Sequence, residues 1–143
     1  MTALGSDHAG YDLKYEIIKY LESIGAGYTD FGNFGTEPDD YPLYAKSVCG
    51  AILDGRYDKG ILICKTGAGM SIAANRFKGI RAALCHDPAT AAASREHNDA
   101  NVLVMGALVV KPELGVDIVK TFFDTGFSFM DRHVRRIRML DEI

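Results

Sequence analysis

The sequence predicts a single α/β domain, residues 1–143, folded as a three-layer α/β/α sandwich of Rossmann-like type with about five parallel strands and a C-terminal helix. Two observations carry this prediction. Short apolar runs alternate along the chain with segments whose apolar residues recur at helical spacing, which is typical of a parallel sheet with helices on both faces. No repeat, linker or low-complexity stretch marks a domain boundary.

The expected strands are short apolar runs bounded by glycine or polar residues. They are residues 3–5, 27–31, 60–64, 80–84 and 102–105. Their length and their flanking residues favour buried strands over helices.

The expected helices lie between these runs. Three of them present an apolar face, formed by Leu13, Ile17, Leu21 and Ile24, by Ala45, Val48, Cys49 and Ile52, and by Leu114, Ile118 and Phe122. Asp87 followed by Pro88 is typical of an N-cap with proline at the first helical position, and Gly25 is expected to end the first helix. A further helix is expected to begin near Met70, and a basic one after Asp131.

Composition and charge exclude several classes of protein. With 16 Lys and Arg against 19 Asp and Glu, the net charge is −3, and 48% hydrophobic with 24% charged residues is ordinary for a globular domain. No apolar run approaches the roughly 20 residues that cross a bilayer, and the N-terminus lacks the features of a signal peptide. We therefore expect a cytoplasmic protein with no membrane partner. Nucleic acid is not an expected partner either, because the basic stretch 132–138 has no interleaved aromatic residues.

The three cysteines are Cys49, Cys64 and Cys85. Their number is odd and their spacing shows no C-x-x-C pattern, so the sequence predicts free thiols rather than disulfides or a zinc site.

The loop that follows the third expected strand is the richest candidate for chemistry. Ligands of parallel sheets bind outside the carboxyl ends of the strands. Gly67 and Gly69 allow the backbone to turn tightly and present successive N–H groups, and the next helix adds the positive end of its dipole. The loop, residues 64–69, is therefore predicted to cradle an anion.

Three known anion-binding loops do not fit this spacing. Ile72 stands where a dinucleotide fingerprint needs its third glycine, and Cys64 stands where a P-loop needs the glycine before its lysine. Met70 stands where a cysteine phosphatase needs arginine. The remaining interpretation is an oxyanion on carbon, such as an enediolate, with Cys64 as the base that removes the proton beside the carbonyl.

Several ordered motifs resemble one family along almost the whole chain. They are Gly5-Ser6-Asp7-His8-Ala9-Gly10, Asp40-Tyr41-Pro42, Cys64 with Thr66-Gly67-Ala68-Gly69-Met70-Ser71-Ile72-Ala73-Ala74-Asn75, Gly79-Ile80-Arg81-Ala82-Ala83, Ser94-Arg95-Glu96-His97-Asn98-Asp99-Ala100-Asn101 and Arg132-His133. This pattern closely resembles the family of type B ribose-5-phosphate isomerases and galactose-6-phosphate isomerases. The resemblance implies an enzyme that interconverts phosphorylated aldoses and ketoses without a metal or an organic cofactor.

The resemblance also implies roles for single residues. Cys64 would be the base that moves a proton between C1 and C2 of the sugar. The backbone from Lys65 to Met70 would hold the enediolate, and Thr66 would lie against the sugar oxygens. This assignment includes Gly67, Ala68 and Gly69 among the residues that bind substrate.

The resemblance implies a second set of residues at the sugar hydroxyls, the ring oxygen and the phosphate. Asp7 and Asn98 would also touch the sugar, and His97 would protonate the ring oxygen to open the furanose. The phosphate would be bound by His8, Arg132 and Arg136. The two arginines lie four residues apart on the expected basic helix, so both guanidinium groups can reach one phosphate.

His97 and Asn98 precede the fifth expected strand and therefore lie at its amino-terminal edge, away from the usual ligand edge. A site that includes His97 is expected to be completed by a second subunit. The resemblance implies the same, namely a homodimer with shared active sites that often pairs into tetramers.

Two departures from the family pattern bear on the substrate. Lys65 stands where glycine is usual beside the cysteine, and Leu108 stands where many members carry arginine. In another branch glutamate is the base at the position of Ser71, where serine cannot replace it, so the role returns to Cys64. Ribose 5-phosphate is the leading substrate; a tetrulose, allose or galactose phosphate, or a non-catalytic phosphosugar-binding paralogue or subunit, stays open. The Asp40-Tyr41-Pro42 motif is equally compatible with a wall of the site and with a turn.

Overall fold

A five-stranded parallel sheet forms the middle layer of the computed structural model, which describes residues 1–143. The strands are β1 (Thr2–Ser6), β2 (Tyr28–Asp30), β3 (Lys59–Cys64), β4 (Ala82–Leu84) and β5 (Val102–Gly106). Their order in the sheet is β2-β1-β3-β5-β4, and every pair is parallel. The predicted α/β fold is confirmed.

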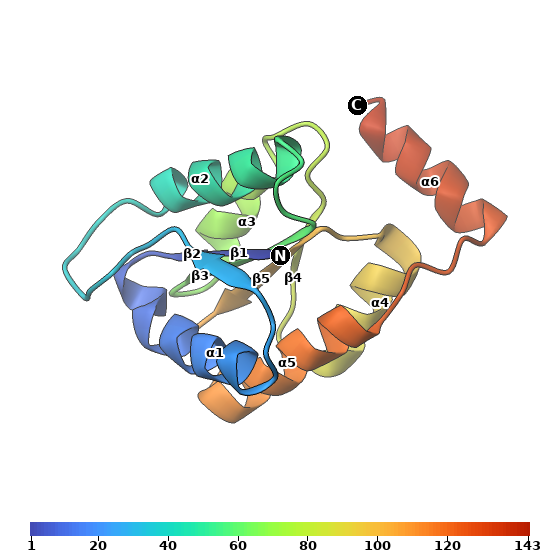
Figure 1. Ribbon diagram of the computed structural model, residues 1–143. Helices are drawn as coiled ribbons and strands as arrows, with labels where there is room; N and C mark the ends of the chain where they lie inside the picture. Colours follow the sequence, from blue (N-terminus) through green and yellow to red (C-terminus); the bar gives the residue numbers. More distant parts are fainter.

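Helices cover both faces of the sheet. One face carries α1 (Tyr11–Ser23), α4 (Pro88–Asn98) and α5 (Pro112–Asp124), and the other carries α2 (Tyr41–Leu53) and α3 (Ala68–Ala74) (Figure 1). Each layer packs its apolar face on the sheet and forms its own half of the core. None of these helices is long and apolar enough to span a membrane.

The third strand shows how the sheet serves both halves of the core. Ile61 and Ile63 pack with α1, α4 and α5, whereas Leu62 and Cys64 pack with α2 and α3. Successive side chains of a strand point to opposite faces, and a strand covered on both sides must be apolar throughout. This explains the continuous apolar run that the sequence shows from Gly60 onward.

Two helix boundaries form where the sequence predicts them. The Asp87 carboxylate accepts a hydrogen bond from the Thr90 backbone N–H at 2.7 Å and so caps α4, with Pro88 at the first helical position. Gly25 follows α1 with a φ of 68°, a left-handed conformation that glycine adopts without steric cost.

One detail of the prediction is wrong, and one helix begins slightly earlier than its expected start. Ile24 was expected on the buried face of the first helix, but α1 ends at Ser23 and Ile24 is 58% exposed. The turn into the left-handed residue that follows carries its side chain off the helical face. The helix expected near Met70 begins earlier, at Ala68, because Gly67 with a φ of 82° turns the chain directly into it.

Two further segments extend this framework. A short 3-10 turn, η1 (His8–Gly10), joins β1 to α1, and the C-terminal helix α6 (Asp131–Asp141) lies beyond α4 at one side of the molecule (Figure 1). The predicted basic C-terminal helix is therefore present.

The register brings the carboxyl ends of three strands together. Ser6 of β1 pairs with Ile63 of β3, and Cys64 pairs with Gly106 at the end of β5. β2 lies on one side of β1 in the sheet, and β3, the next strand along the chain, lies on the other side of β1. Such a switch point leaves a crevice at the carboxyl edge of the sheet.

Candidate active site

Cys64 ends β3 at this crevice, and its thiol is almost buried, with 5% of the residue exposed. The Gly67 backbone N–H donates a hydrogen bond to Cys64 Sγ at 3.2 Å. An N–H group directed at sulfur stabilises negative charge there. Cys64, the loop 65–69, Asp7 and His8 together are called the carboxyl-edge cluster below.

The loop after Cys64 is shaped by the end of β5. A β-carbon at Gly106 would lie 2.3 Å from the Thr66 carbonyl oxygen, so only glycine permits this close approach. The backbone N–H of Leu108 donates to the Lys65 carbonyl at 2.8 Å and ties the two segments together. The conformation of the loop therefore depends on a strand that is distant in sequence.

Two N–H groups of the expected cradle already have acceptors within the loop. That of Gly67 points to sulfur, and that of Ala68 donates to Thr66 Oγ1 at 3.2 Å. The first helical bond of α3 runs from the Ser71 N–H to the Gly67 carbonyl. The N–H groups of Gly69 and Met70 thus have no acceptor in the helix and remain available for a bound oxyanion.

Tyr41 covers this part of the loop. A β-carbon at Gly69 would lie 2.6 Å from Tyr41 Cζ, so the ring packs directly on the glycine while 38% of the residue stays exposed. Tyr41 also begins α2. The ring therefore forms a wall beside the loop at the start of α3.

Asp7 and His8 follow β1 at the same edge. The Asp7 carboxylate accepts hydrogen bonds from the N–H groups of Ala9 and Gly10, at 3.0 and 3.1 Å, and caps η1. The His8 N–H donates to Asp39 Oδ1 at 3.1 Å, and the Asp39 N–H lies 3.3 Å from His8 Nδ1. Because Nδ1 faces Asp39, Nε2 is left for a ligand.

Asp39 is a residue that the sequence reasoning missed. Its carboxylate also accepts hydrogen bonds from Asn33 Nδ2 at 2.6 Å and from the Tyr44 hydroxyl. Burial raises the pKa of Asp39, but the hydrogen bonds from Tyr44, His8 and Asn33 outweigh it and leave the pKa below its usual value. The same contact raises the pKa of Tyr44 to about 12. The only sequence signal was a polar run before α2, which an ordinary loop explains equally well.

The other two cysteines lie in the core. All three thiols are free, as the sequence predicts. Burial raises the pKa of Cys49 to about 12 and that of Cys85 to about 11, so both are protonated thiols at neutral pH. Cys64 alone has its sulfur at the end of a strand beside an N–H donor.

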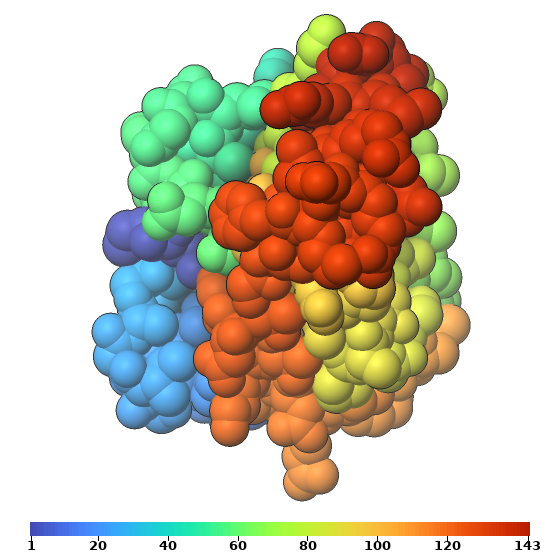
Figure 2. Space-filling model, turned by 90° about the vertical axis from the view of Figure 1, so that its right-hand side faces the viewer, coloured from blue at the N-terminus to red at the C-terminus, as the bar shows by residue number.

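The remaining predicted site residues form a second group, the amino-edge cluster. His97 and Asn98 end α4, and Arg132 and Arg136 lie on α6. All four are exposed, and neither arginine forms an ion pair within the chain. In Figure 2 the red α6 covers the upper part of this face, above the yellow α4.

His133 joins the two helices of this cluster. Its ring packs on that of His97, with centroids 4.7 Å apart, and Ser128 Oγ lies 2.5 Å from its Nδ1. Burial lowers the pKa of His133, and the positive charge of Arg132 lowers it further. The ring therefore stays neutral to a lower pH than an ordinary imidazole.

The two clusters lie at opposite edges of the sheet within one chain. Cys64 pairs with Gly106 at the end of β5, whereas His97 precedes the start of that strand at Val102. The strand from Val102 to Gly106 separates the two levels by about 13 Å. A groove of about 500 Å³ opens beside the amino-edge cluster, between α6 and residues 75–83. Asn98 lines this groove and Cys64 does not.

Comparison with known proteins shows what the chain is related to. Residues 2–140 match the sequence model of the ribose/galactose isomerase family. The chain belongs to this family. The resemblance is thereby confirmed, and with it the predicted class of enzyme, an aldose–ketose isomerase.

Individual relatives cover nearly the whole isomerase. Ribose-5-phosphate isomerase B of Escherichia coli is 45% identical over 141 residues, which are 99% of this chain and 94% of the relative. D-erythrulose-4-phosphate isomerase of Pectobacterium atrosepticum is 44% identical over 127 residues, 88% of this chain and 84% of the relative.

The fold is equally close to solved structures. The crystal structure of a ribose 5-phosphate isomerase from Thermotoga maritima has a TM-score of 0.97 and 48% sequence identity, and the match covers 99% of this chain and 97% of that one. The type B enzyme of Leishmania infantum has a TM-score of 0.94 and 45% identity, with coverages of 99% and 94%.

The two departures from the family pattern are neighbours in this isomerase. Lys65 is exposed and makes no ion pair, and Leu108, bonded to it through the backbone, is 56% exposed. Both lie at the carboxyl edge beside Cys64. No group of three or more His, Cys, Asp or Glu side chains is placed to hold a metal ion.

Proposed function

We propose that the protein interconverts ribose 5-phosphate and ribulose 5-phosphate through a cis-enediolate, with Cys64 as the base. The observation that carries this proposal is the Gly67 N–H donated to Cys64 Sγ at 3.2 Å, in the crevice at the carboxyl edge of the sheet. The ribose-5-phosphate isomerases among its relatives support the choice of substrate.

The proton moves between two adjacent carbons. The Cys64 thiolate takes the proton from C2 of the open-chain aldose, the C1–C2 double bond forms, and negative charge develops on O1. The free N–H groups of Gly69 and Met70 stabilise that charge. The thiol then returns the proton to C1, while the C2 hydroxyl loses its proton and O1 gains one, which yields the ketose.

Other residues prepare the substrate for this step. Thr66 Oγ1 accepts the Ala68 N–H, so its own proton is free to be donated to a sugar oxygen. Asp7 and Asn98 contact the sugar hydroxyls. His97 protonates the ring oxygen and opens the furanose before the proton is moved.

The phosphate would be bound by groups from both clusters. His8 presents Nε2 at the carboxyl edge, whereas Arg132 and Arg136 lie at the amino edge of the same chain. Because one chain does not bring these groups together, we propose a homodimer in which each active site combines the carboxyl-edge cluster of one copy with the amino-edge cluster of the other. Two such dimers can pair into a tetramer.

Deuterium exchange tests the reaction. The protein is incubated in deuterated water with ribose 5-phosphate, and deuterium is expected at C2 of the recovered aldose. Cys49→Ala, a change of a core thiol, is the matched control for Cys64→Ala. If the wild-type protein incorporates no deuterium with any sugar phosphate, the chain is a non-catalytic phosphosugar-binding protein.

Mixing two inactive variants tests the shared site. Cys64→Ala and His97→Ala are unfolded together, mixed in equal amounts and refolded. Half of the dimers are then hybrids with one intact site, so about one quarter of the wild-type activity is expected to return. No recovery, with dimers formed, would contradict the shared site.

A four-carbon sugar phosphate is the second candidate substrate. Compared with the family pattern, Lys65 adds a positive charge beside Cys64 and Leu108 removes one. A relative of 44% identity is a D-erythrulose-4-phosphate isomerase. A panel of C4, C5 and C6 aldose and ketose phosphates, the allose and galactose phosphates included, is compared by kcat/KM. A highest value for a C5 sugar supports ribose 5-phosphate, and a highest value for a C4 sugar favours the tetrulose phosphate.

A further inference from the structure

Arg81 lies one residue before β4 and has no assigned role in the reaction. Its side chain is 20% exposed; two of the three guanidinium nitrogens donate hydrogen bonds, and the third lies within ion-pair distance of a carboxylate. Nε donates to the backbone carbonyls of Asn98 and Asp99, each at 3.1 Å. One terminal nitrogen donates to Asp99 Oδ2 at 3.3 Å, and the other lies 3.6 Å from Asp141 Oδ1.

These contacts fix the end of α4. The last carbonyls of a helix carry partial negative charge, which a guanidinium at this position stabilises. Asp99, the C-cap residue directly after α4, has a φ of 45°, in the left-handed region. Arg95 donates to the other oxygen of the same carboxylate at 2.8 Å. The turn that holds His97 and Asn98 is therefore gripped from two sides.

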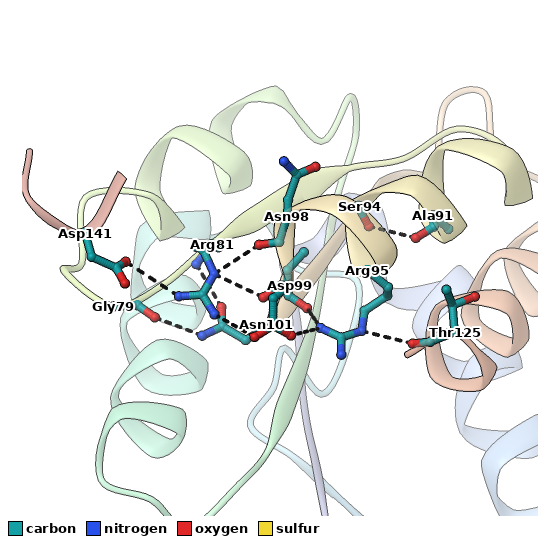
Figure 3. Close-up of polar contacts among 11 residues, drawn as sticks. Gly79, Arg81, Ala91, Ser94, Arg95, Asn98, Asp99, Asn101, Thr125 and Asp141 are labelled. Carbon is teal, nitrogen blue, oxygen red and sulfur yellow. Dashed lines mark hydrogen bonds and ion pairs between the residues drawn. The ribbon is translucent and has the colours of Figure 1, made fainter. Parts of the chain in front are cut away.

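The same two arginines connect this turn to α6. Asp141, which pairs with Arg81, is the last residue of α6. Arg95 Nε donates to the Thr125 carbonyl at 3.3 Å, at the start of the segment that leads into α6 (Figure 3). Arg81 thus holds the C-terminal end of α6, and Arg95 holds the start of the segment that leads into this helix.

The backbone and the side chain of Asn98 point in different directions. Its backbone carbonyl faces Arg81, whereas its side-chain amide points away from the guanidinium (Figure 3). The amide stays available for a ligand while the backbone is held.

We propose that Arg81 is the positioning residue of the amino-edge cluster, which sets His97 and Asn98 relative to the phosphate-binding arginines of α6. The inference rests on the proposed function for the importance of those residues. A displacement of about 1 Å in a catalytic or substrate-binding group lowers the rate by roughly 100-fold. Loss of the Arg81 contacts is therefore expected to lower catalysis and not only stability.

The test compares Arg81→Gln and Arg81→Lys with Arg76→Gln. Arg76 lines the same groove, is exposed and makes no ion pair, so it is the matched control. Four properties are measured: kcat/KM, the inhibition constant of inorganic phosphate, the Tm, and the 15N NMR signals of the four histidines.

Arg81→Gln is expected to lower kcat/KM by about 10- to 100-fold, with a raised KM and weaker inhibition by phosphate. The signals of His97 and His133 move, and those of His8 and His86 stay. Arg81→Lys keeps the charge but loses the planar guanidinium, so its kcat/KM is expected to lie between those of the wild type and Arg81→Gln. Arg76→Gln stays within about twofold of the wild type in every measurement.

The proposal is overturned if Arg81→Gln keeps kcat/KM within about twofold while the His97 and His133 signals do not move. It is also overturned if only the Tm falls, since that is a purely structural role. If Arg81→Gln does not fold, Arg81→Lys is judged by the same criteria. If the wild-type protein turns over no sugar phosphate, the proposed function fails, and the histidine signals still decide whether Arg81 positions His97.

Discussion

The carboxyl-edge cluster is held mainly by backbone atoms, whereas the amino-edge cluster is held by side-chain charges and rings. At Cys64 the decisive contacts are the N–H of Gly67 and the close approach of Gly106 to Thr66. At His97 they are the ring of His133 and the ion pairs around Asp99. Backbone geometry at a strand end leaves little freedom, so the first cluster is preorganised. The second depends on the buried side chains of His133 and Arg95 and on Arg81, and these place the exposed His97 and Asn98.

The thiol of the carboxyl-edge cluster should give the largest effect. Cys64→Ser replaces the proposed base by a hydroxyl that does not ionise near neutral pH, and kcat/KM is expected to fall by about 10²- to 10⁴-fold. Steady-state kinetics measures this loss, and Cys85→Ala serves as the control for a core thiol. Equal losses in the two variants would remove Cys64 from the mechanism.

The amino-edge cluster is tested by His97→Asn. Without a proton donor for ring opening, kcat/KM with ribose 5-phosphate is expected to fall by about 100-fold. A four-carbon aldose phosphate cannot close a furanose ring through its phosphorylated oxygen, so its turnover should change far less. His86→Asn, a change of an exposed histidine, is the control. A similar loss with both sugars would make His97 a binding residue.

Gly106→Ala tests whether the backbone of β5 shapes the loop after Cys64. A β-carbon at this position meets the Thr66 carbonyl, so the loop must shift and kcat/KM is expected to fall by about 10- to 100-fold. Gly126→Ala is the control because a β-carbon there meets nothing within 4 Å. If Gly106→Ala shows wild-type kinetics, the loop is less rigid than the comparison of the two clusters implies.

Leu108→Arg tests whether the exposed leucine at the carboxyl edge affects which sugar phosphate is preferred. An arginine at this exposed position can reach a phosphate at the carboxyl edge, and a charged hydrogen bond of about 1.5 to 3 kcal/mol corresponds to roughly tenfold or more in affinity. The ratio of kcat/KM for C5 over C4 sugar phosphates is expected to rise by that factor. Leu53→Arg, at another exposed leucine, is the control. An unchanged ratio would show that Leu108 does not select the substrate.

The two core thiols are expected to affect stability at high pH and not catalysis. Burial raises the pKa of Cys49 to about 12 and of Cys85 to about 11, from 9.0. As the pH rises, both thiols ionise at a lower pH in the unfolded chain than in the folded protein. Their contribution to the free energy of unfolding is therefore complete below pH 9 and is lost toward pH 11 to 12.

Urea denaturation at pH 8 and pH 10 measures this loss. The free energy of unfolding is expected to be lower at pH 10, by roughly 3 kcal/mol from the two thiols together. A variant with both Cys49→Ala and Cys85→Ala should lack that part of the decrease. If the decrease is the same in the variant, other groups are responsible for it.

Much of the fold could be predicted because its signals are local. The apolar runs, the Asp87 cap with Pro88 and the end of α1 at Gly25 each depend on a few adjacent residues, and the structure has them in place. The position of Ile24 was missed because the last turn of a helix depends on how the next residues leave it.

The candidate site was predictable only in its residue types. The motifs named Cys64, His97 and the arginines of α6, but Asp39 and Arg81 were not recognised as supporting residues. Each of these two acts through contacts with segments more than ten residues away, such as Asp39 with His8 and Arg81 with Asp99. Such pairings follow from the packing of helices on the sheet and leave no periodic trace in the sequence.

The sequence by itself determined the class of fold, the family and the chemical groups at the two edges of the sheet, because strand and helix patterns and ordered motifs are properties of neighbouring residues. Only the tertiary structure decided which N–H groups remain free beside Cys64 and that His8 presents Nε2. Hydrogen bonds are directional and short, so their partners are settled only when distant segments take their places around the sheet.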